Sequence, residues 1–186
     1  MRVTAGRLGG RNLVAPADTR VRPTSDKVRQ AIFNVLAHND FGVGFTLEGA
    51  RVIDLFAGTG ALGLEALSRG ARYCLFIDDH SESRALIRKN IEALRLTGVT
   101  KIWRRDATDL GEISMDKPFD LAFLDPPYRK NLLAPALASL RSGHWLSPVA
   151  IIVAEMAEDE KLSAEGFVML DERVYSETRV AILKAV

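Results

Sequence analysis

The segment RVIDLFAGTGALGLEALSRG, residues 51–70, decides the fold of this chain. It begins with an apolar run at 51–56 and passes through the glycine turn AGTG. It then continues as ALGLEALSRG, whose apolar residues recur at helical spacing up to Gly70. A strand that runs through a tight turn into a helix is the repeating unit of parallel sheets. The segment therefore predicts a strand at 51–56 and a helix at 61–70.

The same alternation of strand and helix continues along the chain. Further strands are expected at 72–77, 100–105, 119–125 and 149–155, with two more within 167–185, and helices at 24–38, 81–98 and within 132–146. Repeated units of this kind predict an α/β fold with a doubly wound, mostly parallel, seven-stranded sheet. Because a polar turn joins the last two strands, we expect an antiparallel C-terminal strand at the sheet edge.

The length of 186 residues and the hydrophobic content of 47% are enough for one domain with a sizeable core. Residues 1–16, MRVTAGRLGGRNLVAP, alternate like a small β-hairpin with LGGR at its turn. We therefore expect a single domain over 1–186, which consists of a basic N-terminal β-hairpin extension (1–24) and an α/β core (25–186).

Several classes of protein are disfavoured by the composition. The chain contains no run of roughly 20 apolar residues that would span a bilayer, and its first residues lack the apolar core of a signal peptide, so we expect a cytoplasmic protein with no membrane partner. The single cysteine, Cys74, lies in an apolar run and is expected to be a buried thiol. No zinc spacing is present and the three histidines are scattered, so no metal site is expected.

Charge is distributed unevenly along the chain. Residues 1–36 hold seven Arg or Lys and two Asp, whereas the remaining residues hold 18 basic and 22 acidic residues. A basic arm on a mildly acidic body indicates a polyanionic partner, although a solvated charged hairpin would have the same composition. Pro23 restrains Arg22, and Thr24 or Ser25 can cap the helix that carries Arg29.

The first strand ends in Asp54 and is followed by Gly58, Gly60 and Gly63, which match the pattern G-x-G-x-x-G. Either a dinucleotide or S-adenosylmethionine could bind at such a turn. A dinucleotide would place its anionic pyrophosphate at the helix N-terminus, close to the Asp54 carboxylate. S-adenosylmethionine has no phosphate and carries an ammonium and a sulfonium, so Asp54 favours the methyl donor.

Two further acids follow the next strands. Asp78, about 20 residues after the glycines, can accept hydrogen bonds from ribose hydroxyls, and this holds for either cofactor. Asp106 can accept a hydrogen bond from an adenine amino group. Ligands bind at the carboxyl ends of strands in open α/β sheets, so three acids at successive strand ends beside a glycine loop predict an adenosine-containing ligand.

The fourth strand runs into Asp125, Pro126, Pro127 and Tyr128, the motif DPPY. The prolines stiffen the chain and contribute no backbone N–H groups. Asp125 and the Pro126 carbonyl can therefore accept the two hydrogens of an exocyclic amine and direct its lone pair at a methyl group. Tyr128 can stack on a flipped base. The motif predicts methyl transfer to the amine of a nucleobase.

Together, VRPTSDKVRQAIFNVL, DLFAGTGALGLEALSRGA and DPPY resemble the RsmD family of S-adenosylmethionine-dependent 16S rRNA guanine-N2 methyltransferases, and the resemblance covers nearly the whole chain. It implies a Rossmann-like class I methyltransferase that modifies small-subunit rRNA, presented within a ribosomal particle. Relatives commonly carry a glutamate where the second strand here ends in IDDH, so Asp78 or Asp79 could hold the ribose. Strand alignment favours Asp78.

The predicted site has three parts. The catalytic residues are Asp125, Pro126, Pro127 and Tyr128; the cofactor-binding residues are Asp54, Phe56, Gly58, Gly60, Asp78, Asp106 and Ala107; the RNA-binding residues are Arg7, Arg11, Arg22, Thr24 and Arg29. Three other functions remain open. A DNA or tRNA amino-methyltransferase would use the same donor and would be recognised by its substrate. A non-catalytic RNA-binding module would lack turnover, and a dinucleotide oxidoreductase would bind a nicotinamide cofactor.

Overall fold

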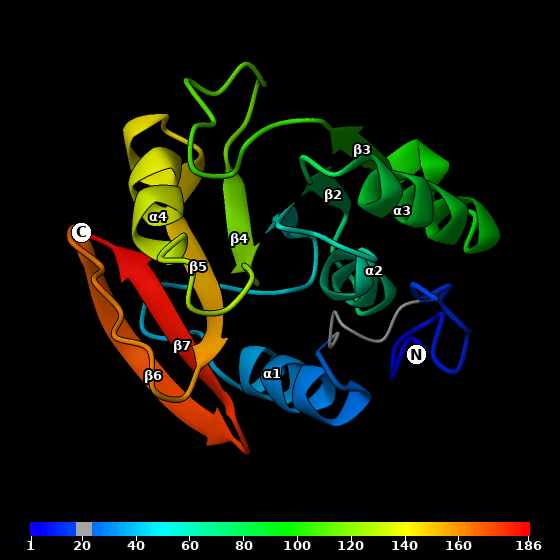
Figure 1. Ribbon diagram of the computed structural model, residues 1–186, viewed down its shortest axis with the longest axis horizontal. Helices are drawn as coiled ribbons and strands as arrows, with labels where there is room; N and C mark the ends of the chain where they lie inside the picture. Colours follow the sequence, from blue (N-terminus) through cyan, green and yellow to red (C-terminus); the bar gives the residue numbers. More distant parts are fainter. Residues whose placement is uncertain (18–23) are drawn as a thin grey trace.

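The computed structural model describes residues 1–17 and 24–186, and its seven strands form one sheet in the order β3-β2-β1-β4-β5-β7-β6 (Figure 1). The strands are β1 (Arg51–Leu55), β2 (Tyr73–Ile77), β3 (Thr100–Trp103), β4 (Phe119–Leu124), β5 (Leu146–Ala157), β6 (Phe167–Tyr175) and β7 (Thr178–Ala185). Strands β1 to β5 pair in parallel, whereas β7 runs antiparallel to both β5 and β6. The predicted doubly wound, mostly parallel sheet with an antiparallel C-terminal strand is thereby confirmed.

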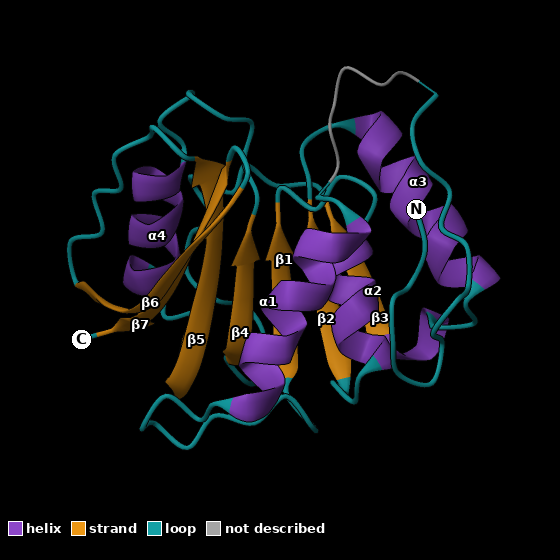
Figure 2. Ribbon diagram, turned by 90° about the horizontal axis from the view of Figure 1, so that it is seen from below, coloured by secondary structure: helices purple, strands orange, loops and turns teal. Residues whose placement is uncertain are grey.

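Helices cover both faces of the sheet (Figure 2). The helices are α1 (Asp26–His38), α2 (Ala61–Ser68), α3 (Ser81–Ala93) and α4 (Leu133–Ser142), with a short 3₁₀ turn, η1 (Thr97–Val99). Buried residues of α1, α2 and α3 belong to one apolar cluster with the strands, and buried residues of α4 belong to a second cluster on the opposite face. Parallel strands covered on both faces are apolar throughout, which explains their continuous hydrophobic runs in the sequence.

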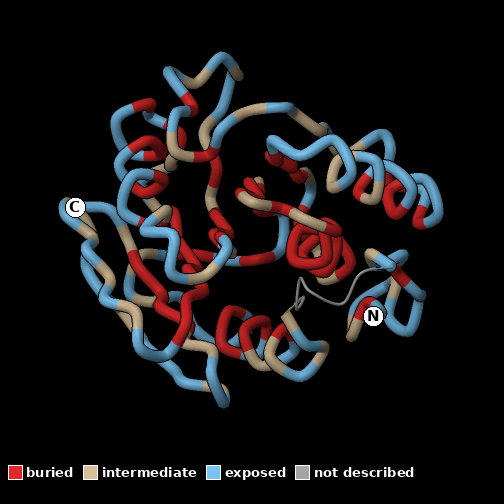
Figure 3. The backbone as a smooth tube through the Cα atoms, in the orientation of Figure 1, coloured by how far each residue is buried: buried red, intermediate tan, exposed pale blue. Residues whose placement is uncertain are grey.

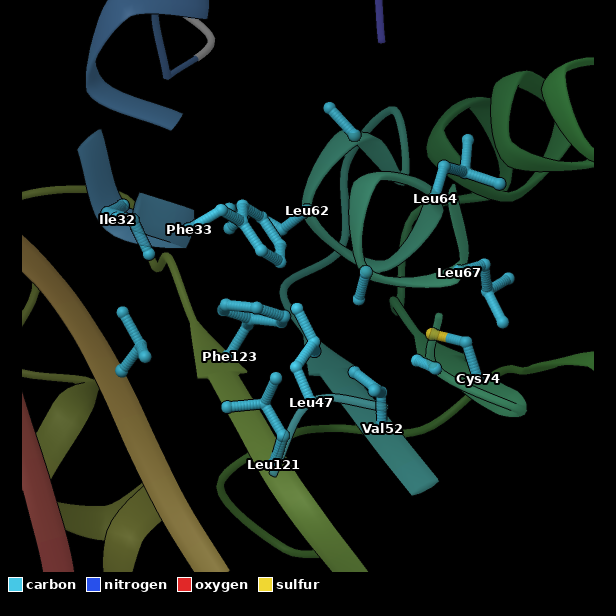
Figure 4. Packing of buried hydrophobic residues seen from close by; sticks show 14 of the residues in the cluster. Ile32, Phe33, Leu47, Val52, Leu62, Leu64, Leu67, Cys74, Leu121 and Phe123 are labelled. Carbon is cyan, nitrogen blue, oxygen red and sulfur yellow. The ribbon is translucent and has the colours of Figure 1, made fainter. Parts of the chain in front are cut away.

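Alternation along the strands assigns each side chain to one of these two clusters. Leu121 and Phe123 of β4 face the cluster of α1 and α2, whereas Ala122 and Leu124 face α4. Figure 4 shows Phe33 of α1 above Phe123, with ring centroids 5.5 Å apart. The buried positions are concentrated at the centre of the molecule (Figure 3). Burying one large apolar side chain there contributes about 1.5 to 3 kcal/mol to the stability of the fold.

Several element boundaries differ from the sequence prediction. Helix α3 ends at Ala93 rather than near residue 98, because Arg95 adopts a left-handed backbone conformation (φ 57°). Strand β3 ends at Trp103, and β5 begins at Leu146 rather than at 149, where its pairing with β4 passes through a bulge.

The N-terminal segment pairs with itself less extensively than predicted. A single antiparallel bridge joins Arg2 to Asn12, and the turn begins before LGGR, with the Gly9 amide donating to the Gly6 carbonyl. Gly6 has φ 81°, and a Cβ atom there would lie 2.1 Å from the carbonyl oxygen of Ser68 on α2. The hairpin is thus pressed against α2, and only glycine fits at this position.

Cys74 is fully buried, as predicted, against α2, where a Cβ on Gly63 would lie 2.5 Å from its Sγ atom. The third glycine of the motif therefore permits helix α2 to pack directly on β2. Among the described residues, no helix is long and apolar enough to cross a membrane.

Candidate active site

Three acidic side chains lie at the carboxyl ends of three neighbouring strands, on the same face of the sheet. Asp54 of β1, Asp125 directly after β4, and Glu155 of β5 follow the residues that face α1 and α2, so all three side chains extend toward that side. Helix α1 begins here because Ser25 caps it, its hydroxyl accepting a hydrogen bond from the Val28 amide at 3.2 Å. The preceding residue, Thr24, reaches the acids.

The Thr24 hydroxyl oxygen is the point where two of these acids meet. It lies 3.0 Å from Oδ2 of Asp125, and 3.1 and 3.0 Å from the two carboxyl oxygens of Glu155. Asp54 and Glu155 are each 1% exposed, whereas Asp125 is partly exposed. The sequence prediction missed Glu155, although an acid that interrupts the apolar run VAIIVAEMA is itself a signal of a special position.

Burial shifts the titration of all three acids. It raises the pKa of Asp125 to about 6, despite the hydrogen bond from Thr24, which lowers it. Burial, and then the nearby Asp125 charge, raise the pKa of Glu155 well above its usual range. Burial likewise raises the pKa of Asp54, although a backbone hydrogen bond from Gly63 opposes the shift. The cluster therefore retains protons that exposed carboxyls would have released.

The donors of the glycine turn are already used within the protein. The Gly58 amide donates to Asp78 at 2.9 Å, the Gly63 amide donates to Asp54 at 3.0 Å, and the Gly60 amide donates to the Ala57 carbonyl at 2.7 Å. A pyrophosphate at this turn would find carboxylates in place of N–H donors. The geometry thus argues against a dinucleotide.

A cavity of about 150 Å³ lies beside this turn. Its lining includes Asp54, Phe56, Gly58, Leu86 and Asp125, so an apolar surface is combined with two carboxyl groups. These carboxyl groups and the apolar surface fit a ligand that carries positive charge and an apolar part, as S-adenosylmethionine does. Asp54, Phe56, Gly58 and Asp125, predicted separately from the sequence, are brought together here. Gly60, Asp78, Asp106 and Ala107 do not line this cavity.

Asp78 and Asp79 differ sharply in their surroundings. Asp78 is 8% exposed and accepts hydrogen bonds from the amides of Gly58 and His80, one on each carboxyl oxygen, which leaves a second lone pair on each. Asp79 is exposed and pairs with the His80 ring at 2.6 Å. The position beside the glycine turn favours Asp78 as a ribose acceptor.

Asp106 lies on the exposed loop after β3, followed by the buried Ala107. One of its carboxyl oxygens accepts hydrogen bonds from both the hydroxyl and the amide of Thr108, which lower the pKa of Asp106. The carboxylate is fixed by this turn and remains ionised.

Tyr128 ties the DPPY segment to the far edge of the sheet. Pro126 is buried and Pro127 is exposed, and the Tyr128 phenol oxygen lies 3.0 Å from the hydroxyl oxygen of Thr178 on β7. Burial raises the pKa of Tyr128 to about 12. A second cavity, of about 390 Å³, opens beside the ring of this tyrosine; its lining includes Thr24, Tyr128, Glu158, Tyr175 and Thr178.

The predicted RNA-binding residues fall into different environments. Arg7 and Arg11 are exposed on the N-terminal hairpin, whereas Arg22 lies outside the described residues. The prediction that Arg29 contacts RNA is wrong, because its side chain is fully buried and cannot reach a phosphate. Thr24 is likewise directed at Asp125 and Glu155 rather than at the outer surface.

Arg29 has a structural role instead. Its guanidinium pairs with Glu65 at 3.3 Å and with Asp26 at 2.8 Å, and it donates to the backbone carbonyls of Thr24 and Arg2. The residue connects the N-terminal hairpin, α1 and α2. A charged residue at this spacing could not be distinguished from a surface cation by sequence alone.

The strand order, the antiparallel last strand and the acidic strand ends are those of a Rossmann-like class I methyltransferase. A family model described as Conserved hypothetical protein 95 matches residues 1–184, and the chain belongs to this family, the RsmD family that its motifs resemble.

Individual relatives agree with this assignment. The chain is 37% identical to the Bacillus subtilis protein YlbH over 188 residues, which cover 99% of this chain and 98% of that protein. It is 31% identical to the ribosomal RNA small subunit methyltransferase D of Haemophilus influenzae over 176 residues, covering 93% and 88% of the two chains. The solved structure of yhhF from Escherichia coli has a TM-score of 0.82 at 28% identity and covers 100% of this chain and 97% of that one.

Proposed function

We propose that this protein transfers a methyl group from S-adenosylmethionine to the N2 amine of a guanine in small-subunit (16S) ribosomal RNA. The observation that carries the proposal is the position of Asp125, which lines the cavity beside the glycine turn, while Tyr128 of the same motif lines the second cavity. Thr24 lines both cavities. A methyl donor in the first cavity and an acceptor base in the second could therefore meet at the Asp125 carboxylate.

The cofactor would be held by residues around the first cavity. When bound, S-adenosylmethionine supplies an electrophilic methyl group on a sulfonium. Asp54 offers carboxyl oxygens that can accept hydrogen bonds from the ligand's ammonium, Phe56 and Leu86 offer apolar surface, and Asp78 offers its remaining lone pairs to ribose hydroxyls. We assign Asp106 and Ala107 to the adenine end of the ligand, because they follow β3 at the same edge of the sheet.

Asp125 and Pro126 would orient the acceptor amine. A guanine N2 lone pair is delocalised into the ring, so the nitrogen must become more tetrahedral before it attacks. The Asp125 carboxylate and the Pro126 carbonyl accept its two hydrogens, and neither proline has an N–H group that competes. With a pKa of about 6, Asp125 is largely ionised at neutral pH and can also receive the proton that the amine loses.

The second cavity is suited to the base itself. The rings of Tyr128 and Tyr175 line it, and an aromatic face can stack on an extruded nucleobase. Glu158 and Asp159 also line it, together with Arg129, which pairs with Asp159 at 2.9 Å, so the Glu158 carboxylate is the one offered to N–H donors. Guanine presents such donors at N1 and N2, which supports guanine as the acceptor.

We further propose that residues 1–186 act as a single cytoplasmic catalytic domain, and that Arg7 and Arg11 of the hairpin extension contact rRNA phosphates. Both side chains are exposed, and the N-terminal hairpin lies beside α2, where the Arg7 amide donates to the Ser68 carbonyl (Figure 1). The name of the Haemophilus influenzae relative gives small-subunit ribosomal RNA as that protein's substrate, and we propose that the ribosomal subunit or an assembly intermediate presents the RNA to this chain.

Methyl transfer from labelled S-adenosylmethionine tests the proposal directly. Small ribosomal subunits, naked 16S rRNA, tRNA and duplex DNA are offered in parallel, and the modified nucleoside is identified by mass spectrometry. We expect N2-methylguanosine in 16S rRNA. Methylation of tRNA or DNA alone would support the alternative amino-methyltransferases, and binding of a nicotinamide cofactor in calorimetry would point to the oxidoreductase.

A further inference from the structure

Glu155 is a buried acid to which the proposed reaction assigns no role. It is 1% exposed, and both of its carboxyl oxygens lie within 3.1 Å of the Thr24 hydroxyl oxygen. Thr24 also lies 3.0 Å from Oδ2 of Asp125. Burying an acid beside another acid is unfavourable unless one of them holds a proton, so its presence in this cluster calls for a physical explanation.

The number of hydrogens at Thr24 limits the arrangement. A threonine hydroxyl has one hydrogen to donate and two lone pairs with which to accept. It can donate to Asp125 or to Glu155, but not to both. The acid that does not receive this hydrogen can approach the hydroxyl oxygen favourably only by donating a hydrogen of its own, and that acid must then be protonated.

Burial decides which acid holds the proton. Glu155 is almost completely enclosed, whereas Asp125 is partly exposed at the first cavity. Burial, reinforced by the charge of Asp125, raises the pKa of Glu155 well above its usual range, whereas the pKa of Asp125 reaches about 6. Glu155 is therefore the acid that retains its proton to higher pH, and Asp125 is the one that ionises first.

We infer that Glu155 is a positioning residue, which donates a hydrogen bond to the Thr24 hydroxyl so that this hydroxyl in turn donates to Oδ2 of Asp125. The inference rests on the proposed function for its catalytic consequence. The chain of two hydrogen bonds fixes the orientation of the Asp125 carboxylate and leaves its other oxygen for the acceptor amine. Thr24 would thus connect α1 to two strand ends.

The other charged groups around Glu155 come from several elements. Asp54 on β1 and Asp125 after β4 raise its pKa, and Arg29 on α1 lowers it. The Arg29 guanidinium is engaged with Glu65 and Asp26. Burial, and then the charges of Asp125, Glu155 and Glu160, raise the pKa of the Tyr128 phenol. The residue paired with Glu155 on β7 is the apolar Val180. Among the described residues, the groups nearest to Glu155 therefore favour its neutral form.

Carbon-13 NMR of the carboxyl groups tests the protonation pattern without any substrate. We expect the Glu155 carboxyl carbon to show the shift of a protonated acid at about pH 7, and the Asp125 carbon to titrate near 6. Thr24→Val removes the hydrogen bond that lowers the pKa of Asp125, so its titration moves upward, and Thr24→Ser restores it. An ionised Glu155 at neutral pH, or an unchanged Asp125 titration in Thr24→Val, would overturn the inference even if the protein proved to methylate a different substrate.

The pH profile of turnover provides the second test. In the wild type, turnover should fall at high pH as Glu155 loses its proton and the chain of hydrogen bonds breaks. Glu155→Gln keeps a permanent N–H donor, so it should stay within about threefold of the wild type near neutrality and lose this alkaline decline. Glu155→Leu, which cannot donate, should lower kcat about tenfold or more with a smaller effect on KM for the methyl donor.

Glu92→Gln, on the exposed face of α3, is the matched control and should keep the wild-type profile. An alkaline decline that persists unchanged in Glu155→Gln, or full turnover in Glu155→Leu, would contradict the role of Glu155. Absence of methyl transfer by the wild type on every RNA would contradict the proposed function instead, and the NMR titrations would still decide the hydrogen-bond chain.

Discussion

The phenol oxygen of Tyr128 lies 3.0 Å from the hydroxyl oxygen of Thr178, and this hydrogen bond ties the segment after β4 to the antiparallel strand β7. It places the tyrosine ring against the larger cavity. Tyr128→Phe removes the hydrogen bond but keeps the ring, and it should lower kcat about threefold. Tyr128→Ala removes the stacking surface as well, at a cost of about 1 to 3 kcal/mol in base binding.

Thr178→Val is the matched control, since it breaks the same hydrogen bond from the other side. It should reproduce the effect of Tyr128→Phe in steady-state kinetics. If Tyr128→Ala were no worse than Thr178→Val, the ring would have no part in binding the base.

Asp125 should determine the acidic side of the pH profile. Its carboxylate accepts hydrogens from the amine only when ionised, so turnover should be lost as the pH falls through about 6. Asp125→Ala should lower methyl transfer about a hundredfold, while the affinity for S-adenosylmethionine in calorimetry changes little. Near-normal turnover in this variant would remove Asp125 from the mechanism.

The same raised pKa values should make the protein less stable as the pH rises. A carboxyl whose pKa is higher in the folded than in the unfolded protein contributes stability that is complete below the unfolded pKa and is lost as the pH rises through the folded pKa. For Asp125 this window runs from its usual value of 3.8 to about 6. Asp125→Asn cannot ionise, so its melting temperature should exceed that of the wild type at about pH 8 and not at about pH 4.

Glu82→Gln, which removes an exposed acid of α3, should leave the difference between the two pH values unchanged. If the melting temperature of Asp125→Asn equals that of the wild type at both pH values, ionisation of Asp125 does not destabilise the folded protein.

The regular part of the fold could be predicted from the sequence because it follows from local patterns. Apolar runs identified the buried strands β1, β2, β4 and β5, the alternation of strand and helix identified the others, and the glycine turn indicated the edge where ligands bind. The boundaries of α3 and β5 could not be predicted, because they depend on the conformation of Arg95 and on the bulge opposite β4. Such features arise from tertiary packing, which a local pattern does not encode.

The candidate site was predictable where acids follow strands and unpredictable where the chain folds back on itself. Asp54, Phe56, Gly58 and Asp125 share one cavity, as their positions at strand ends implied. The hydrogen bond between Thr24 and Glu155 joins residues 131 positions apart, and nothing in either local sequence specifies it. Arg29 was misassigned for the same reason, because only the folded structure brings Glu65 into contact with its guanidinium.

The pair Asp78 and Asp79 offers a test of the cofactor site. Asp78→Ala removes an acceptor of ribose hydroxyls and should weaken the binding of S-adenosylmethionine by about 1.5 to 3 kcal/mol. The variant also removes the acceptor of the Gly58 amide, so calorimetry should be accompanied by thermal unfolding. Asp79→Ala should have little effect, because its side chain is exposed and pairs only with His80 among the described residues. The reverse ranking would show that the ribose is held one residue further along.

The two kinds of arginine in the N-terminal region should respond oppositely to substitution. Arg29→Met leaves Glu65 buried with one partner fewer and should destabilise the protein by about 3 to 5 kcal/mol, as expected when one member of a buried ion pair is removed.

The double change Arg7→Ala, Arg11→Ala removes only exposed charges and should leave the melting temperature within about 1 °C. The double variant should instead weaken RNA binding and reduce its salt dependence by a log-log slope of roughly 0.7 to 0.9 for each phosphate that is no longer neutralised. Affinities for 16S rRNA fragments at several salt concentrations, with S-adenosylmethionine binding as the control, decide the matter. Coincident lines for the wild type and the double variant would mean that Arg7 and Arg11 are solvated and do not bind RNA.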